Sequence, residues 1–152
     1  MTPTPEIEAL GLLEIEGIPS ALRAQDEALK RAPVDIIAFA PVSAGKVVMI
    51  LGGAVACVEE SLQAADAIVG SRRIDYLFLP GIHPSVVAAI HNTRTDVPER
   101  QSLGMMEFAT AGSGILAADA AVKAAVVTLA RVHLASGFGG KAFVSLWGEQ
   151  SD

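Results

Sequence analysis

The chain has little of what secreted, membrane-spanning or metal-binding proteins use. Its 152 residues include one cysteine, Cys57, which cannot form an internal disulfide and is typical of a reducing compartment. The longest apolar stretch, 47–58, has 12 residues, against the roughly 20 of a membrane-spanning helix. Residues 1–9 contain two glutamates and no basic residue, unlike a signal peptide. We therefore expect no membrane partner and a cytoplasmic location.

The sequence also contains no cluster of charges of one sign. The net charge is −6, from 11 basic and 17 acidic residues, and no basic stripe is present. Nucleic-acid binders usually carry such a stripe, so we expect no nucleic-acid partner. The three histidines (His83, His91 and His133) are scattered, and with Cys57 they match no zinc spacing. The sequence predicts no metal site.

No arrangement of residues points to catalysis. Two Gly-Lys pairs, at 45–46 and 140–141, lack the leading glycine and the following Ser or Thr of a phosphate-binding loop, and are interpreted as tight turns. Asp26 and Asp119 each precede a lysine by one helical turn, which predicts exposed ion pairs rather than catalytic acids. No Ser, His and Asp cluster has a nucleophile elbow. We expect that the protein is not an enzyme.

What the chain does contain is an internal duplication. Residues 10–14 (LGLLE) recur as 103–107 (LGMME), and 24–30 (AQDEALK) recur as 117–123 (AADAAVK). The Gly-Lys pair at 45–46 recurs at 140–141, with a loop two residues longer, and Gly53 corresponds to Gly148. Matches at so many points in the same order indicate two copies of one structural unit.

The first copy alternates between strand and helix patterns. We expect strands over 9–15, 34–40, 46–51 and 74–79, and helices over about 19–32 and 55–69. Ser20 is expected to cap the first helix, with ion pairs Asp26–Lys30 and Glu27–Arg31 along it. Gly70 is expected to end the second helix. The order βαββαβ predicts an α+β, ferredoxin-like fold.

The second copy follows the same order but stops early. We expect strands over 103–108, 126–134 and 141–147 and a helix over about 113–125, with no counterpart of the last helix and strand. The predicted organisation is a first domain at 8–90 with a short extra helix at 83–90, a linker at 91–101, and an incomplete second domain at 102–152. A fragment, a chain shortened on purpose and completion by another polypeptide remain open as explanations.

These motifs resemble a known family. The pattern LGLLE, then A-x-D-x-A-x-K-x-A at 24–32, a Gly-Lys strand and GGAV at 52–55 are similar to the shell-protein domain of bacterial microcompartments. The duplication resembles the tandem-domain, trimer-forming branch, and most of all its propanediol-utilisation members, through 77–86 (LFLPGIHPSV), 100–104 (RQSLG) and 127–133 (VTLARVH). The likeness covers residues 8–152.

The resemblance implies a structural function. Such chains form homotrimers that mimic a hexagon, tile with other shell proteins around encapsulated enzymes, and carry a central pore for small metabolites. Lys30 and Lys123 stand at the family's edge lysine and would contact neighbouring tiles. The two Gly-Lys loops would border the pore, with Val42, Ser43, Ala44 and Gly45 from the first and Ser136, Gly137, Phe138 and Gly139 from the second.

One position departs from the branch. Its propanediol-utilisation members have a cysteine three residues before the Gly-Lys lysine, and three copies hold an iron–sulfur cluster. Ser43 stands there in this chain, and a hydroxyl is not the thiolate that such a cluster needs. We therefore expect no cluster, no other cofactor and a small polar aperture. The alternative function is a regulatory trimer on the same fold that binds a small molecule between its subunits.

Overall fold

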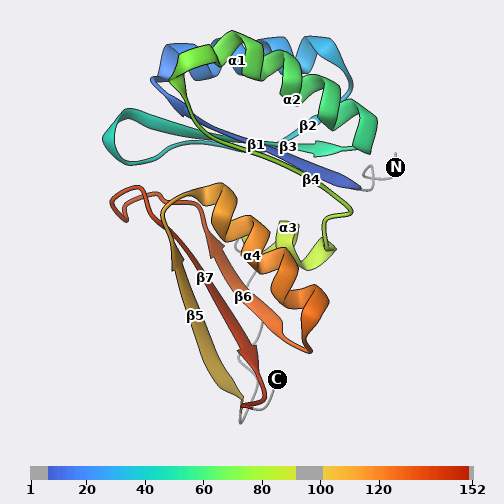
Figure 1. The fold of residues 1–152 in the computed structure, drawn as a ribbon, viewed down its shortest axis with the longest axis vertical. Coiled ribbons are helices and arrows are strands. Elements are labelled where there is room, and N and C mark those ends of the chain that lie inside the picture. The colour runs from blue at the N-terminus through green and yellow to red at the C-terminus, as the bar shows by residue number, and fades with distance from the viewer. Residues whose placement is uncertain (1–6, 92–100, 151–152) are drawn as a thin grey trace. The chain divides into compact units, whose positions relative to one another are not determined.

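The computed structural model describes residues 7–91 and 101–150, which form two compact units, 1–82 and 83–152 (Figure 1). The first unit contains the complete βαββαβ order that the sequence predicts. Its strands are β1 (Ala9–Glu16), β2 (Asp35–Pro41), β3 (Lys46–Gly53) and β4 (Arg73–Pro80), and its long helices are α1 (Ile18–Arg31) and α2 (Val55–Val69).

The first unit is one antiparallel sheet with both helices on one face (Figure 1). The strand order is β2-β3-β1-β4, so β1 lies between two partners and is buried from Ala9 to Ile15. Gly11 allows α2 to approach β1, because a Cβ there would meet Val58 at 3.0 Å and Leu62 at 3.1 Å. The core lies between sheet and helices and consists of aliphatic and small side chains: Leu13, Ile15, Ala21, Ala24, Ala28, Val47, Met49, Leu51, Leu62, Ala65 and Val69.

The second unit repeats this architecture in a shorter form. It contains α3 (Pro84–Ile90), β5 (Ser102–Phe108), α4 (Ala111–Ala124), β6 (Thr128–His133) and β7 (Ala142–Gly148). Its sheet has the order β5-β7-β6, and α4 covers one face. Among the described residues no element corresponds to α2 or β4, so β5 pairs with β7 alone. Helix α3, which we expected to belong with the first repeat, packs against β6.

The duplication extends to the register of the strands. Leu10 lies opposite Gly52 in the first sheet, and the corresponding Leu103 lies opposite Trp147 in the second. Strand β2 has an irregularity between Ile36 and Ala38, and β6 has one between Leu129 and Arg131, at the equivalent place. A repeated register and a repeated bulge confirm that both units follow one template.

Some local predictions were wrong. Helix α1 begins at Ile18 after Gly17, whose φ of 88° fits a glycine, so Ser20 lies inside the first turn and caps nothing. Arg31 lies 3.8 Å from Glu60 of α2, between Nε and Oε2, rather than pairing with Glu27. The predicted ion pair between Asp26 and Lys30 is confirmed. The predicted end of α2 at Gly70 is also confirmed, and Gly70 has a φ of 55°. No helix among the described residues is both long and apolar enough to cross a membrane.

Candidate functional site

The first Gly-Lys loop is a short, closed turn between β2 and β3. A single 3₁₀ turn, Ser43–Gly45, contains Ala44 and is closed by the Val42 amide, which donates to the Lys46 carbonyl at 2.9 Å. Gly45 has a φ of 75° and accepts from the Gly17 amide at 2.8 Å. A Cβ on Gly45 would meet no atom within 4 Å, so this position requires glycine for its backbone conformation and not for space. The loop therefore presents Ser43, half-buried, at a defined position.

The second Gly-Lys loop connects β6 to β7 and is longer and more open. Four consecutive residues are exposed: Ser136, Gly137, Phe138 and Gly139. Its tip is closed by the Lys141 amide, which donates to the Phe138 carbonyl at 3.0 Å. Left-handed backbone recurs along the loop, at Ala135 (φ 61°), Gly137 (70°), Gly139 (60°) and Gly140 (80°). The three glycines adopt this conformation at little cost, whereas Ala135 is strained.

The sequence did not predict an aromatic cluster that holds the second loop to its sheet. The imidazole of His133 stacks on the Phe143 ring with centroids 4.6 Å apart, and Nε2 lies 2.7 Å from the Ser136 carbonyl oxygen. Phe138 packs edge-on against Phe143 at 5.8 Å, and the Arg131 guanidinium lies 5.8 Å from the same ring. The sequence did contain a signal for this cluster, because the alternation of side chains along paired strands places residues 131, 133 and 143 within reach of one another.

The two predicted edge lysines lie near the ends of equivalent helices. Lys30 donates to Asp26 and Lys123 donates to Asp119, each at 2.5 Å and four residues apart. Both lysines are exposed, with 68% and 44% of their side chains accessible. The hydrogen bond to Asp26, and then its charge, raises the pKa of Lys30 above its usual value. Each cation is therefore held near the C-terminal end of its helix, where the dipole also favours it.

The prediction of an exposed Asp119 was wrong. Asp26 is 62% exposed, but only 5% of the Asp119 side chain is accessible. The reason is the segment that leads into α3: the His83 amide donates to Asp119 Oδ1 at 2.8 Å, while Lys123 donates to Oδ2. One carboxylate thus joins α3 to α4 within the second unit. Nothing in the repeat pattern distinguishes the two aspartates.

The second unit also contains a cavity of about 520 Å³ between α3 and the region where α4 passes into β6. His83 and Ser85 give it a polar corner, with Nδ1 and Oγ 2.7 Å apart. The remaining wall is mostly apolar and is formed by Ala88, Ala89, Val122, Ala125, Val126, Val127, Thr128 and Leu129. Cavities of this size and character can hold small molecules.

The sequence and the fold match those of known proteins. The family model for the BMC domain matches residues 9–82 and again 102–152. The chain belongs to the BMC-domain family. It is 39% identical over 145 residues to the bacterial microcompartment shell protein PduT of Citrobacter freundii, covering 95% of this chain and 78% of that protein. A crystal structure of a microcompartment protein from Desulfitobacterium hafniense matches with a TM-score of 0.87 at 35% identity, over 96% of this chain and 81% of that one.

The loop residues of this BMC-family chain can be compared with the ligands that an iron–sulfur cluster needs. The residues do not fit one: the loop position is Ser43, and the chain's only cysteine, Cys57, lies in α2 and is half-buried. Iron–sulfur clusters are held chiefly by cysteine thiolates. Within residues 7–91 and 101–150, no three His, Cys, Asp or Glu side chains are grouped to hold a metal ion. In this BMC chain the two loops offer hydroxyl and backbone groups and the Phe138 ring.

Proposed function

We propose that this chain forms homotrimers that act as pseudohexameric tiles of a bacterial microcompartment shell, each with a central pore bordered by the two Gly-Lys loops. The observation that carries the proposal is the repetition of one loop at one place in two equivalent sheets, between β2 and β3 and between β6 and β7. Three chains with two such units each would contribute six loops to one axis. The relationship to a shell protein supports the same assembly.

The pore is proposed to pass small polar metabolites without turnover. Ser43 supplies a neutral hydroxyl that can donate and accept, and backbone groups of the glycine-rich loops supply further partners. An aperture of this kind replaces the water around a polar solute without binding it tightly, which passage requires. No iron–sulfur cluster is proposed, because Ser43 stands where a ligating thiolate would be needed.

Two measurements test the proposal. Co-expression with other shell proteins, examined by electron microscopy, should give sheets, tubes or closed shells that contain this chain. Protein purified without oxygen should be colourless and contain no stoichiometric iron or sulfide, and its Ser43→Cys variant serves as the matched comparison. A brown wild-type protein with stoichiometric iron and sulfide would contradict the absence of a cluster, and failure to enter any assembly would contradict the tile.

A second candidate function is a regulatory trimer that binds a small molecule, and the cavity beside His83 and Ser85 is the observation that favours it. Unlike the tile, a regulatory trimer should respond to a small molecule when no other shell protein is present. A metabolite that raises the melting temperature of the wild-type chain, but not of a variant with the cavity filled by Ala89→Phe, would favour regulation. Assembly into sheets without any such response favours the tile.

A further inference from the structure

The cavity of the second unit has walls from three elements. Helix α3 packs against both β6 and α4 (Figure 1), and the cavity of about 520 Å³ lies where the three meet. Ala89 of α3 and Leu129 of β6 line it and are only 3% and 4% exposed, so the cavity reaches the packed interior of the unit. A volume of this size is typical of sites that hold small ligands.

The polar corner of the cavity has hydrogen bonds of defined direction. His83 Nδ1 accepts from the Ser85 amide at 3.3 Å, which caps α3, and it lies 2.7 Å from the Ser85 hydroxyl oxygen. A nitrogen that accepts a backbone N–H carries no proton, so the neutral imidazole holds its proton on Nε2. The corner therefore provides one donor, the Nε2–H of His83, and one acceptor, the hydroxyl oxygen of Ser85.

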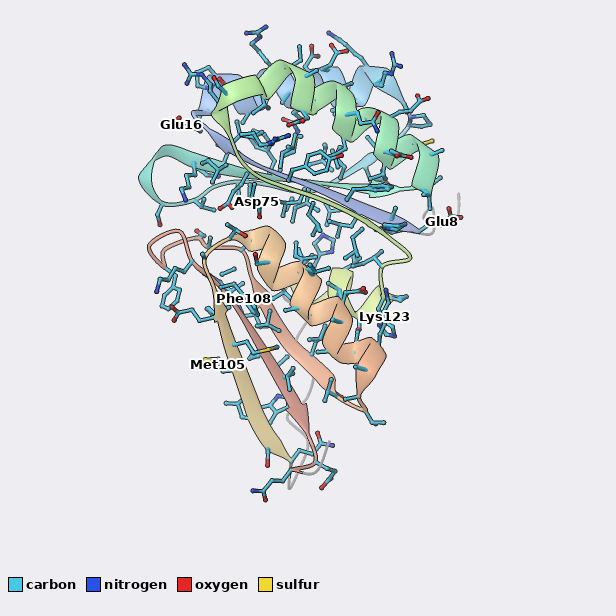
Figure 2. All side chains as sticks on the ribbon, viewed as in Figure 1. Glu8, Glu16, Asp75, Met105, Phe108 and Lys123 are labelled. Carbon is cyan, nitrogen blue, oxygen red and sulfur yellow. The ribbon has the colours of Figure 1, made fainter. Side chains whose placement is uncertain are left out.

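The cation beside this corner is already neutralised. Lys123, which Figure 2 labels on α4, directly follows the lining residue Val122 in the chain. It donates to Asp119 Oδ2 at 2.5 Å, and Oδ1 of the same carboxylate accepts from the His83 amide at 2.8 Å. None of the described residues that line the cavity is Lys, Arg, Asp or Glu. An anionic ligand would therefore be buried without an unpaired cation to meet it, which is costly.

The rest of the lining is aliphatic apart from one threonine. Val126, which borders the cavity, is 87% exposed, although aliphatic side chains are usually buried. A ligand in the cavity would cover part of this side chain, and removal of apolar surface from water favours binding. Among the described lining residues His83 has the only ring, so most contacts with a ligand would be aliphatic.

We propose that this cavity binds a neutral, mostly aliphatic molecule with one carbonyl or hydroxyl oxygen. The oxygen accepts from His83 Nε2, and the hydrocarbon part lies against Val122 and Leu129. An alcohol can in addition donate to the Ser85 oxygen. The inference rests on the second candidate function and names the ligand class for its cavity, whereas the shell tile does not depend on it.

The first experiment compares ligands of similar size on the full wild-type chain. Cyclohexanone and cyclohexanol are the neutral probes, cyclohexanecarboxylate at neutral pH is the charged probe, and ligand-observed NMR titrations give the dissociation constants. The neutral probes should bind at least about tenfold more tightly, because an unpaired charge opposes burial of the carboxylate. Equal or tighter binding of the carboxylate would overturn the ligand class, and no saturable binding of any probe would overturn the site.

The second experiment tests the polar corner and the volume of the cavity. His83→Asn keeps a residue that caps helices well but lacks a counterpart of Nε2, so cyclohexanone should bind at least about tenfold more weakly. The matched control is His91→Asn, at an exposed histidine outside the lining. Ala88→Leu fills the cavity from an exposed lining position and should abolish binding, whereas Ala120→Leu, exposed on α4 outside the lining, should not. Circular dichroism verifies the folding of all four variants.

The outcomes separate this inference from both candidate functions. Loss of binding in His83→Asn and Ala88→Leu, with binding kept in their controls, supports the site. Equal binding by all four variants overturns it and leaves the tile intact. A wild-type chain whose melting temperature rises with the carboxylate alone keeps a regulatory function and overturns the ligand class. Saturable binding of the neutral probes by a chain that enters no shell assembly supports the site and contradicts only the tile.

Discussion

At the scale of single residues, the duplication acts as an internal control. Asp26 and Asp119 have the same neighbours in sequence and the same lysine partner at 2.5 Å, yet one is exposed and the other is buried. The difference is the His83 amide, which adds a hydrogen bond and excludes water. A charge that is buried with two donors depends on both of them, because an unmatched polar group in the interior is costly.

The first prediction compares these two aspartates directly. Asp119→Ala should destabilise the second unit by about 2–3 kcal/mol, because it leaves the His83 amide and the Lys123 ammonium without their shared acceptor. Asp26→Ala should change stability by less than about 0.5 kcal/mol, as an exposed pair does. Urea unfolding of both variants measures the difference. Equal effects of the two substitutions would contradict the role assigned to Asp119.

A second prediction concerns the only tyrosine. Burial, and then the charges of Asp66 and Glu59, raise the pKa of Tyr76 above its usual 10.0. Above pH 10 the unfolded chain would ionise this phenol while the folded unit keeps it neutral, so unfolding releases a proton and stability falls as pH rises. The near-ultraviolet phenolate signal should therefore have its midpoint above pH 10. Tyr76→Phe should flatten the fall of the melting temperature with pH, and an unchanged slope would count against it.

At this scale, a prediction from the sequence was correct where the local sequence determines the structure. Burial that depends on a residue packed from elsewhere in the chain could not be predicted. Gly70 was predicted as a helix end because a left-handed residue favours glycine, and its φ of 55° agrees. Ser20 was predicted as a cap, but the helix starts two residues earlier at Ile18. Burial of Asp119 depends on His83, which is 36 residues away, and no local pattern reports such a contact.

At the scale of elements, equivalent helices begin in different ways. Helix α4 follows Thr110, whose Oγ1 accepts from the Ser113 amide at 3.2 Å and lies 2.9 Å from the Ser113 hydroxyl. The equivalent position before α1 is Gly17, which has no side chain and adopts a φ of 88°. The first helix is stabilised by its packing on α2, whereas α4 contacts the short α3 and the described residues include no counterpart of α2, so its cap should matter more.

The third prediction tests the Thr110 cap. Thr110→Ala should cost about 1 kcal/mol, because the first turn of α4 loses an acceptor for one of its free amides. Thr110→Ser keeps the hydroxyl and should retain most of the stability, which makes it the matched control. Thermal unfolding followed by circular dichroism checks both variants. A loss as large in the serine variant as in the alanine variant would show that the methyl group, not the cap, is responsible.

The order of elements could be predicted almost completely, because hydrophobic periodicity and Gly or Pro boundaries repeat in both copies. The position of the loop in the second unit could be predicted from the sequence, but its conformation could not. Its shape depends on His133, Phe138 and Arg131 meeting at Phe143, and such a cluster forms only when two strands are in register. Periodicity predicts that a strand exists, whereas register decides which side chains meet.

At the scale of the whole molecule, the proposed function rests on surfaces that are repeated. Both units have a Gly-Lys loop at the same place, the same helix end and the same lysine, and the relative PduT is a shell protein. Repetition of a contact set is what a tile requires, because closed rings use one set of surfaces and extended layers use another. The edge lysines lie in helices α1 and α4, outside the two Gly-Lys loops, so ring formation and layer formation should be separable by mutation.

The fourth prediction separates these two levels of assembly. Lys30→Glu should preserve the trimer but prevent extended sheets, because this ammonium group is exposed at the proposed tile edge and already lies beside the exposed Asp26. Reversal there places like charges together at every edge, and like charges in contact repel. Light scattering measures the trimer, and electron microscopy of the co-expressed shell proteins measures the sheets. Lys46→Glu, at the start of β3, reverses the charge of one lysine in the same way, so it is the control for Lys30→Glu and should still allow sheets. Sheets that persist in the Lys30→Glu variant would show that the tile edge lies elsewhere.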